Sequence, residues 1–517
     1  MKDLFSSWKQ DLPASIVVFL VALPLCLGVG LASTSTKGIE GLPNIFTGII
    51  AGIIGGIIVG IISKSKIGVS GPAAGLITIV LSAITTIGSY EGFLVALILA
   101  GLFQLIAGFI GLGALGNYFP SSVIKGMLAA IGITLILKEI PHALGYDKDF
   151  FGDESFFQYD GHNTFSELIY ALNAFSPTAI IISALSLILL IFFDSKRIKK
   201  IAIFRFIPGA LIVVTIGIVL NQLLNGLGGY WSLNDKHLVN MPVSKSLGDF
   251  FKQFNQPDFS FLSNIKVYSI ALSIALVASL ETLLSVEATD KLDPNKNQTP
   301  TNHELKAQGI GNIVSGLLGG LPITQVIVRS SANVTAGGQT KMATMFHGIL
   351  LLASVYFIPQ IINLIPLASL AAILIMVGYK LSKIELYRST YQLGMEQFLP
   401  FIGTIAGVIF TDLLKGIGIG LLIAIFFILR RNYKRNFNLI TSPDEKEKRI
   451  ILSENVSYLN KGSIIRLLDG IPESTSLIID GTNCKYIDYD VREAISEFSS
   501  YTAKHRNIQI SYVHYEN

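Results

Sequence analysis

Residues 323–338 combine residue types that could bind an anion inside an apolar protein. The segment begins with a β-branched, extended-looking run that ends at Val328, places Arg329 next, and continues with the small residues Ser330 and Ser331. The helix that starts there, and that the two glycines closing the segment should stop, is expected to be too short to span a bilayer. Its N-terminus would present unpaired backbone N–H groups and the positive end of a helix dipole, and Arg329 would add positive potential. This combination favours a small anionic substrate.

The first half of the chain contains a matching segment, residues 66–75. It too is a short extended run that ends in small residues, and Pro72 suits the first turn of a helix. The alternative interpretation is an ordinary helix start after a turn. Two interrupted segments in corresponding places of two halves are the best indication in a sequence of a transporter's substrate site. Together they predict these substrate-binding residues: Ser70, Gly71, Ala73, Arg329, Ser330 and Ser331.

Glu281 lies well inside an apolar run, residues 268–286. An acidic side chain at the centre of a bilayer costs about 2.5–3.5 kcal/mol, so such a residue indicates a functional site by default. Ser285 lies one helical turn further along the same face, and Arg329 is the obvious opposite charge. The alternative is a buried ion pair between Glu281 and Arg329 that only fixes helix packing.

The composition is that of a polytopic membrane protein. Hydrophobic residues make up 51% of the 517 positions and charged residues only 14%, whereas soluble proteins carry roughly 25% charged residues. The two cysteines, Cys26 and Cys484, imply neither a disulfide framework nor a metal site. The sequence contains no nucleotide-binding, metalloprotease or hydrolase motif. We therefore expect secondary transport with no cofactor, no enzymatic activity and no nucleic-acid partner.

Apolar segments fill residues 13–432, which we expect to form the transmembrane transporter domain after a polar segment, residues 1–12. Basic residues gather in loops on one side of the predicted spans, and the long loop after Pro141 on the other side is acidic. The positive-inside rule then places both termini in the cytoplasm, with the chain in the lipid of the cytoplasmic membrane. The basic residues that set this orientation include Lys64, Lys66, Lys196, Arg197, Lys199, Lys200, Arg205, Lys291, Lys296, Lys380, Lys383 and Arg388.

A glycine stripe runs along the second apolar segment, because Gly48, Gly52, Gly56 and Gly60 recur every fourth residue. Such a small-xxx-small stripe lets another helix approach closely. We expect it to serve helix packing within the chain, and a dimer contact is the alternative.

Residues 449–517 have a soluble composition and follow a charged linker, residues 433–448. Residues 448–453, 462–467 and 476–480 resemble strands, residues 491–505 an amphipathic helix and residues 508–513 a last strand. This order predicts a small α/β domain, and its length is within the usual range for a domain.

Several short motifs, taken in order, resemble those of the SulP (sulfate permease) family of anion transporters. They lie at residues 11–15, 21–25, 70–72, 280–283, 308–312 and 328–331. The run at residues 477–488 is similar to the central strand and loop of a STAS domain, which usually follows the membrane domain in this family. The resemblance covers nearly the whole chain.

The resemblance implies a 7+7 inverted-repeat transporter fold with a core and a gate domain, two half-helices and a STAS-like C-terminal domain. It also implies a homodimer and an elevator-like movement of the core. The anion would lie between the N-termini of the half-helices, one carrying Ser70, Gly71 and Ala73. The other would carry Arg329, Ser330 and Ser331. Glu281 and Ser285 match an acid and a hydroxyl that take part in cation coupling in some members.

The sequence departs from the family pattern at two places. Sodium–bicarbonate members carry a hydroxyl residue shortly before the arginine, where this chain has residues 325–328, Gln-Val-Ile-Val. A proton therefore becomes the better expectation than Na⁺ as coupling ion. Asp488 and Tyr489 stand where phosphorylatable STAS domains have Asp-Ser. We therefore interpret the domain as a structural or interaction module.

The predicted function is secondary active transport of a small inorganic anion, bicarbonate or sulfate, coupled to protons or sodium. A small dicarboxylate stays open as an alternative substrate, because backbone N–H groups select charge and size more than identity. One alternative is an anion channel or an anion sensor that signals through the STAS-like domain. Another is a nucleobase transporter of the same implied fold. That substrate would require aromatic residues beside the half-helices, and residues 66–75 and 323–338 contain none.

Overall fold

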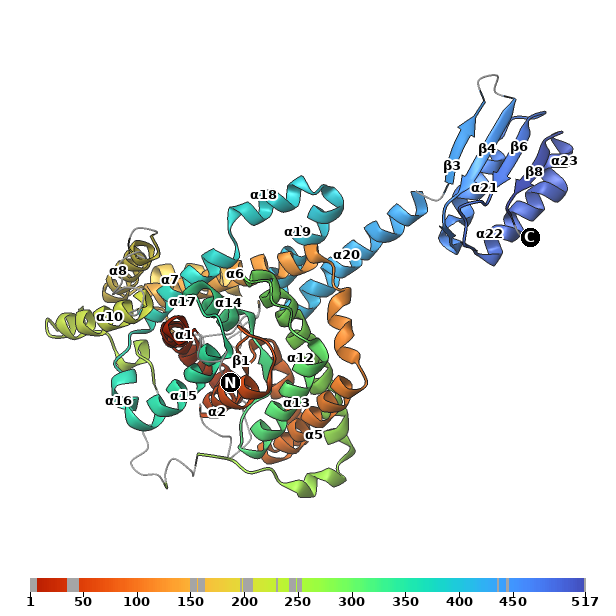
Figure 1. The fold of residues 1–517 in the computed structure, drawn as a ribbon. Helices are drawn as coiled ribbons and strands as arrows, with labels where there is room; N and C mark the ends of the chain where they lie inside the picture. The colour runs from red at the N-terminus through yellow and green to blue at the C-terminus, as the bar shows by residue number, and fades with distance from the viewer. Residues whose placement is uncertain are drawn as a thin grey trace. The chain divides into compact units, whose positions relative to one another are not determined.

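The computed structural model describes residues 7–34, 46–148, 156, 163–195, 198, 208–228, 231–240, 248, 253–434, 437–442 and 446–515. The chain divides into two compact units, Met1–Leu421 and Leu422–Asn517. The first unit is helical and the second combines a sheet with helices (Figure 1). The basic residues predicted between positions 196 and 205 lie outside the described part of the chain, as does most of the acidic loop after Pro141.

The first unit is built from helices of very different lengths. They are α1 (Trp8–Thr34), α2 (Phe46–Ile54), the π-helical η1 (Gly55–Val59), α3 (Gly60–Ile62), α4 (Ile77–Ile87), α5 (Tyr90–Phe109), α6 (Ser121–Leu144), α7 (Thr164–Asn173), α8 (Pro177–Asp194), α10 (Gly209–Asn225), α12 (Ile265–Leu292), α13 (Thr301–Leu317), α14 (Ile327–Ala336), α15 (Lys341–Phe357), α16 (Pro359–Ile362), α17 (Leu367–Leu381), α18 (Ile384–Gln392), α19 (Met395–Phe410) and α20 (Leu413–Lys434), the last of which continues into the second unit.

Six helical stretches among the described residues are long and apolar enough to cross a membrane, among them α1, α5, α12 and α20. The pair α14 and α15 passes the same test only as a bent unit, with a 113° angle at the break. Gly337 ends α14 with a φ of 90°, a conformation that glycine adopts without steric cost. The predicted short helix and its glycine stop are therefore confirmed, but the extended run is shorter than predicted, because Ile327 and Val328 already belong to α14.

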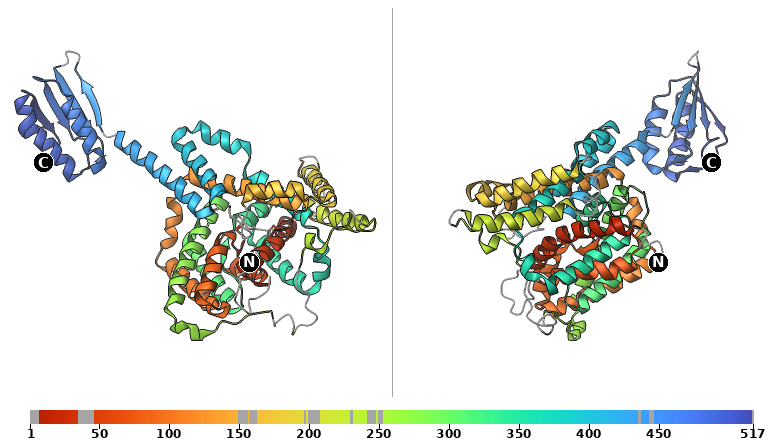
Figure 2. Two further views of the ribbon diagram at one scale, coloured as in Figure 1. Left: turned by 180° about the vertical axis from the view of Figure 1, so that it is seen from behind. Right: turned by 60° about the vertical axis from the view of Figure 1, so that its left-hand side comes forward.

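The helices of the first unit pack as two sets. In one set, α1 packs against α2, α14 and α15, and α5 packs against α12 and α13. In the other, α6 packs against α17 and α19, while α8 and α10 lie side by side at the edge of the unit (Figure 2). The buried carboxylate of Asp11 in α1 accepts hydrogen bonds from the backbone N–H groups of Gln339 and Thr340, at 2.7 and 3.0 Å. This ties the start of α1 to the start of α15, directly after α14.

The glycine stripe of the second apolar segment lies against α1 and α15. A Cβ atom on Gly48 would overlap the carbonyl oxygen of Cys26 in α1, and one on Gly56 would lie 2.6 Å from Cα of Gly348 in α15. Real Cβ atoms essentially never approach other heavy atoms within 3.0 Å. The prediction of close packing within the chain is therefore confirmed.

The two interrupted segments meet as a two-stranded antiparallel sheet near the centre of the first unit (Figure 1). Strand β1 (Ser70–Pro72) pairs with β2 (Ile323–Gln325), and Ser70 lies opposite Gln325. A 3-10 turn, η2 (Ala74–Leu76), then leads from β1 into α4. The prediction of Pro72 in the first turn of a helix is wrong, because Pro72 pairs with Ile323 and the helix begins after it. Ser70 and Gly71, expected in the first half-helix, likewise belong to β1.

The second unit is an α/β domain with a four-stranded sheet in the order β3-β4-β6-β8. Strands β4 (Glu447–Leu452), β6 (Ser476–Asp480) and β8 (Gln509–Val513) are parallel, and β3 (Phe437–Thr441) is antiparallel to β4. Two short strands, β5 (Asn455–Val456) and β7 (Tyr486–Ile487), pair separately. The helices are α21 (Lys461–Asp469), α22 (Tyr489–Glu497) and α23 (Ala503–His505), with a π-helical turn joining the last two.

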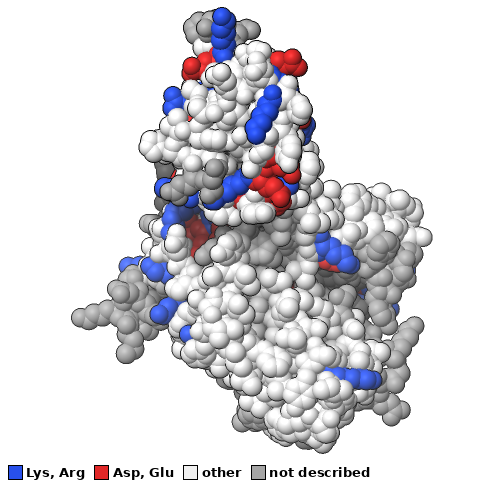
Figure 3. All heavy atoms as spheres, turned by 90° about the vertical axis from the view of Figure 1, so that its right-hand side faces the viewer, with Lys and Arg blue, Asp and Glu red and all other residues white. Residues whose placement is uncertain are grey.

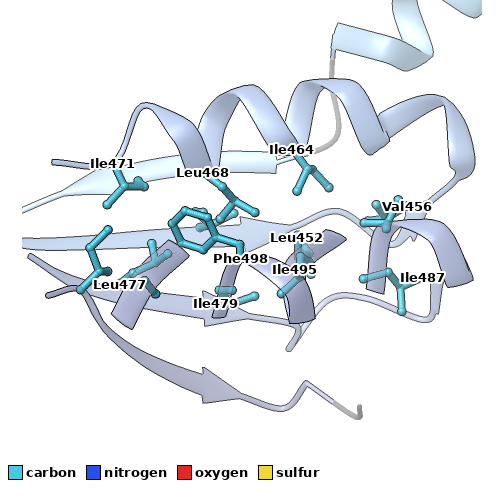
Figure 4. Close-up of a cluster of buried hydrophobic side chains, with 14 residues drawn as sticks. Leu452, Val456, Ile464, Leu468, Ile471, Leu477, Ile479, Ile487, Ile495 and Phe498 are labelled. Atoms are coloured by element: carbon cyan, nitrogen blue, oxygen red, sulfur yellow. The ribbon is translucent and has the colours of Figure 1, made fainter. Parts of the chain in front are cut away.

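One apolar core holds the second unit together. Ile450 and Ile479 on the sheet pack with Ile464 and Leu468 from α21 and with Val491 from α22. Figure 4 shows side chains of this cluster between the helices and the sheet. In the view of Figure 3, charged side chains gather on this unit, whereas the visible surface of the first unit is mostly uncharged.

The structure agrees with three of the four strands predicted for the second unit and corrects one. Residues 462–467 were predicted to be a strand but belong to α21. The physical reason is the spacing of Ile464 and Leu468, four residues apart, which places both on the buried face of a helix. Strand β3 also lies within residues 433–448, the segment that the sequence assigned to a linker.

Candidate functional site

Both interrupted segments place a helix start against α12. Ala73 and Val326 are extended N-cap residues, of η2 and α14 respectively. They belong to one packed apolar cluster with Ala278 and Val277 of α12. The first N–H groups of a helix have no partner within it, so those of residues 327–329, which are buried at the start of α14, lack intrahelical partners. The predicted juxtaposition of the two helix starts is therefore present.

The guanidinium group of Arg329 lies directly on Gly71. The side chain is only 1% exposed, and its Nη2 donates to the carbonyl oxygen of Pro72 at 3.5 Å. A Cβ atom on Gly71 would overlap Nη1 of Arg329 and would lie 3.0 Å from Cζ. Gly71 therefore provides the space that Arg329 occupies, and the cation reaches from α14 across to β1.

The serine hydroxyls of α14 bind the backbone next to the pairing of β1 with β2, a region that we call the crossing. Ser330 Oγ accepts from the N–H of Val69 at 3.0 Å and donates to the carbonyl of Val326 at 2.8 Å. Ser331 Oγ donates to the carbonyl of Val328, also at 2.8 Å. The N–H of Val326 in turn donates to the carbonyl of Val69 at 2.9 Å. These bonds fix the N-terminus of α14 relative to the segment before β1.

Glu281 lies on the α12 face that packs against the first interrupted segment. It is 6% exposed, and a Cβ atom on Gly75 would lie 3.2 Å from its Oε1. Ser285 is buried one turn further along α12. Arg329 borders this segment at Gly71 and Glu281 borders it at Gly75. The structure therefore brings the predicted cation and acid to the same short stretch of backbone.

Three buried polar residues at the pairing of β1 with β2 were not assigned a role from the sequence, and two of them hold its backbone or side chains by hydrogen bonds. Asn312 holds Ile323 from both sides, accepting from its N–H at 2.6 Å and donating to its carbonyl at 3.0 Å. Gln308 donates to Ser70 Oγ at 2.7 Å. The side-chain amide of Gln325 is buried and neither of its polar atoms has a hydrogen-bond partner. Amide side chains in the second half of α13, where the surrounding residues are small or apolar, are the sequence signal that could have identified Gln308 and Asn312.

Comparison with known protein families matches residues 8–404 to the sulfate permease family. The putative sulfate transporter YvdB of Bacillus subtilis (strain 168) is 28% identical over 429 residues, which cover 82% of this chain and 74% of that protein. The bicarbonate transporter BicA of Picosynechococcus sp. (strain PCC 7002) is 24% identical over 436 residues, which cover 83% of this chain and 71% of that protein.

Two solved structures show the same fold. The structure of SLC26A9 matches with a TM-score of 0.67 and 15% identity, and covers all of this chain and 85% of that chain. The transmembrane domain of a cyanobacterial BicA matches with a TM-score of 0.54 and 21% identity, and covers 81% of this chain and 98% of that domain.

These similarities confirm the predicted fold class, a polytopic helical membrane protein with the fold of the SLC26A9 and BicA transporters. The parallel sheet and helices of the second unit are consistent with the STAS-like domain that the sequence predicted. The family match spans well over half of the chain and includes both interrupted segments. The chain therefore belongs to the sulfate permease family.

Proposed function

We propose that this protein is a secondary active transporter of a small inorganic anion, sulfate or bicarbonate. Two relatives described as a putative sulfate transporter and a bicarbonate transporter support this substrate class. The observation that carries the proposal is the crossing of β1 and β2, where Arg329 and the start of α14 meet the start of the first half-helix. A buried cation beside unpaired backbone N–H groups is a site for an anion.

The anion in this proposal is bound mainly by the backbone. The hydroxyls of Ser330 and Ser331 already donate to carbonyl groups of their own helix. Recognition therefore falls to the N–H groups at the start of α14, to Arg329, and to backbone at Gly71 and Ala73, which a small ion can reach. Ser70 Oγ accepts a hydrogen bond from Gln308, which leaves its own O–H available to donate to the anion.

Glu281 is the proposed coupling residue, with Ser285 beside it. The carboxylate borders Gly75 in the segment that would hold the anion, so a proton on Glu281 would reduce the negative charge near the anion and favour its binding. We favour a proton over Na⁺, because residues 325–328 offer no hydroxyl ligand before Arg329.

We further propose that transport takes place in the cytoplasmic membrane, with both termini in the cytoplasm, by an elevator-like movement within a homodimer. The C-terminal domain then serves as a structural or interaction module. The basic residues that support this orientation and lie in the described part of the chain include Lys64, Lys66, Lys291, Lys296, Lys380 and Lys383.

The test is uptake of labelled sulfate and labelled bicarbonate into proteoliposomes, each with and without an imposed proton or sodium gradient. Saturable uptake of one anion that rises with one gradient is the expected result, and it names substrate and coupling ion together. A linear, unsaturable current would instead support an anion channel. Absence of transport by folded protein would contradict the proposal and favour the anion sensor.

A further inference from the structure

Glu304, near the start of α13, is a fully buried carboxyl group that the proposed mechanism does not use. Its exposed fraction is 0%. Oε2 accepts a hydrogen bond from the hydroxyl of Ser63 at 2.5 Å, and Oε1 accepts one from Nε2 of Gln308 at 2.8 Å. Both hydrogen-bond donors are neutral, so they provide only part of the stabilisation that a buried carboxylate needs.

One side chain connects this carboxyl to the proposed anion site. Nε2 of Gln308 donates to Glu304 and also to Ser70 Oγ, at 2.7 Å. Both hydrogens of the amide nitrogen are therefore used, one toward each residue. Oε1 of Gln308 is buried and has no hydrogen-bond partner. Glu304 and the start of the first half-helix thus share one amide group.

Lys341 and His303 lie near Glu304, but each forms its hydrogen bond with a backbone carbonyl and not with the carboxyl group. Nζ of Lys341, at the start of α15, donates to the carbonyl of Ile61 at 3.4 Å. The ring of His303 bonds the carbonyl of Ile62 at 2.9 Å. Lys64 follows Ser63 in the loop after α3 and is exposed. These groups surround the carboxyl with moderate positive potential and connect it to a loop that the basic residues place on the cytoplasmic side.

We propose that Glu304 is a second proton-binding site, on the cytoplasmic side of the anion site, and that Gln308 transmits its charge to Ser70. This rests on the proposed anion transport and deepens it. A carboxylate at Glu304 lies one amide away from the anion and repels it, and a proton on that carboxylate removes the repulsion. One proton is added to a carboxylate oxygen and no covalent bond breaks. The new O–H donates to Ser63 Oγ, or to Oε1 of Gln308 after the side-chain amide rotates by about 180°.

The proposal predicts positive coupling between proton and anion. Since coupling free energy is reciprocal, the factor by which the proton tightens anion binding equals the factor by which the anion tightens proton binding. A like charge within roughly 10 Å, at an effective dielectric constant of about 20, corresponds to a factor of roughly ten or more, which is a shift of at least about one pH unit in the titration of Glu304.

Infrared difference spectroscopy of the full-length protein in lipid tests this without requiring transport. The carboxylic C=O band of the wild type is titrated between acid and alkaline pH, with and without sulfate and then bicarbonate. We expect a band that is missing in Glu304→Gln and that moves by at least about one pH unit when the transported anion is added. Glu287→Gln is the matched control, because Glu287 is partly exposed and paired with Lys291 at 3.1 Å.

Gln308→Met separates the proton site from its link to the anion. In this variant the Glu304 band should remain, while the shift caused by the anion should become smaller, because the hydrogen bonds that join Glu304 to Ser70 are lost and only the direct repulsion is left. A carboxylic band that persists unchanged in Glu304→Gln overturns the proposal. The proposal is also overturned if the titration midpoint of the wild-type band does not change when an anion that the wild type transports is added. Failure of the proposed function is recognised separately, because the wild type would then take up neither anion.

Discussion

Substitution of Gly71 by alanine tests whether Arg329 is part of the anion site. The added Cβ would overlap Nη1 of Arg329 and would lie 3.0 Å from Cζ. Ordinary carbon contacts begin at roughly 3.5–4.0 Å. Because the guanidinium is buried and Gly71 is part of a paired strand, the cation must retreat by roughly 1 Å from the β1 backbone.

The expected loss of anion binding free energy follows from Coulomb's law. With an effective dielectric constant of about 20, moving a cation from about 4 to about 5 Å from an anion costs about 0.8 kcal/mol. This corresponds to about a fourfold increase in the apparent KM for the transported anion. The effect is a lower limit, because the added methyl group also narrows the space beside the backbone.

The assay is the concentration dependence of anion uptake into proteoliposomes, with Gly418→Ala as matched control. Gly418 lies in α20, and a Cβ atom there would meet nothing within 4 Å. The apparent KM of Gly75→Ala should lie between those of the other two variants, because its Cβ would lie 3.2 Å from Oε1 of Glu281. An apparent KM in Gly71→Ala equal to that of Gly418→Ala would refute the placement of Arg329 in the site.

Three further predictions concern coupling, packing and the second unit. Glu281→Gln should abolish gradient-driven uptake while the protein stays folded, and concentrative uptake in this variant would contradict the coupling role. Gly48→Ala should destabilise the protein by about 1–3 kcal/mol or more, since its Cβ would overlap the carbonyl of Cys26; a thermal midpoint equal to wild type would contradict this. Hydrogen bonds from Thr482, followed by Arg449, lower the pKa of Asp480 to about 2. Its contribution to the stability of the second unit is therefore present above about pH 4 and lost toward pH 2, so denaturation of Asp480→Asn should depend less on pH in that range than wild type.

The sequence was sufficient to predict the elements around the crossing. The β-branched run before Arg329 and the glycines after Ala336 predicted a short helix, and the structure contains it. Glu281 was selected as a candidate because an acid in an apolar run is conspicuous, and the structure places it beside Gly75. The strand β6 was predicted with its observed bounds, because a short aliphatic run between polar segments is typical of a buried strand.

Long-range pairing could not be predicted from local signals. Pro72 has the properties of a first-turn helix residue, yet the antiparallel contact with Ile323 keeps it extended. That contact depends on residues from the other half of the chain. Gln308 shows the same limit, because its role arises only where α13 meets β1. Residues 462–467 fit a strand by composition, and the spacing of Ile464 and Leu468 decides for a helix only when the core is known.

The pairing of β1 with β2 also constrains the kinetics of the molecule. Backbone groups that lose their partners away from water cost several kcal/mol each, and the crossing is held by strand pairing together with the bonds from Ser330 and Asn312. The two halves of the anion site are therefore expected to travel together and not to separate when the ion leaves. In the proposed transporter, an anion arriving from either side of the membrane would therefore meet the same backbone groups from both halves of the chain.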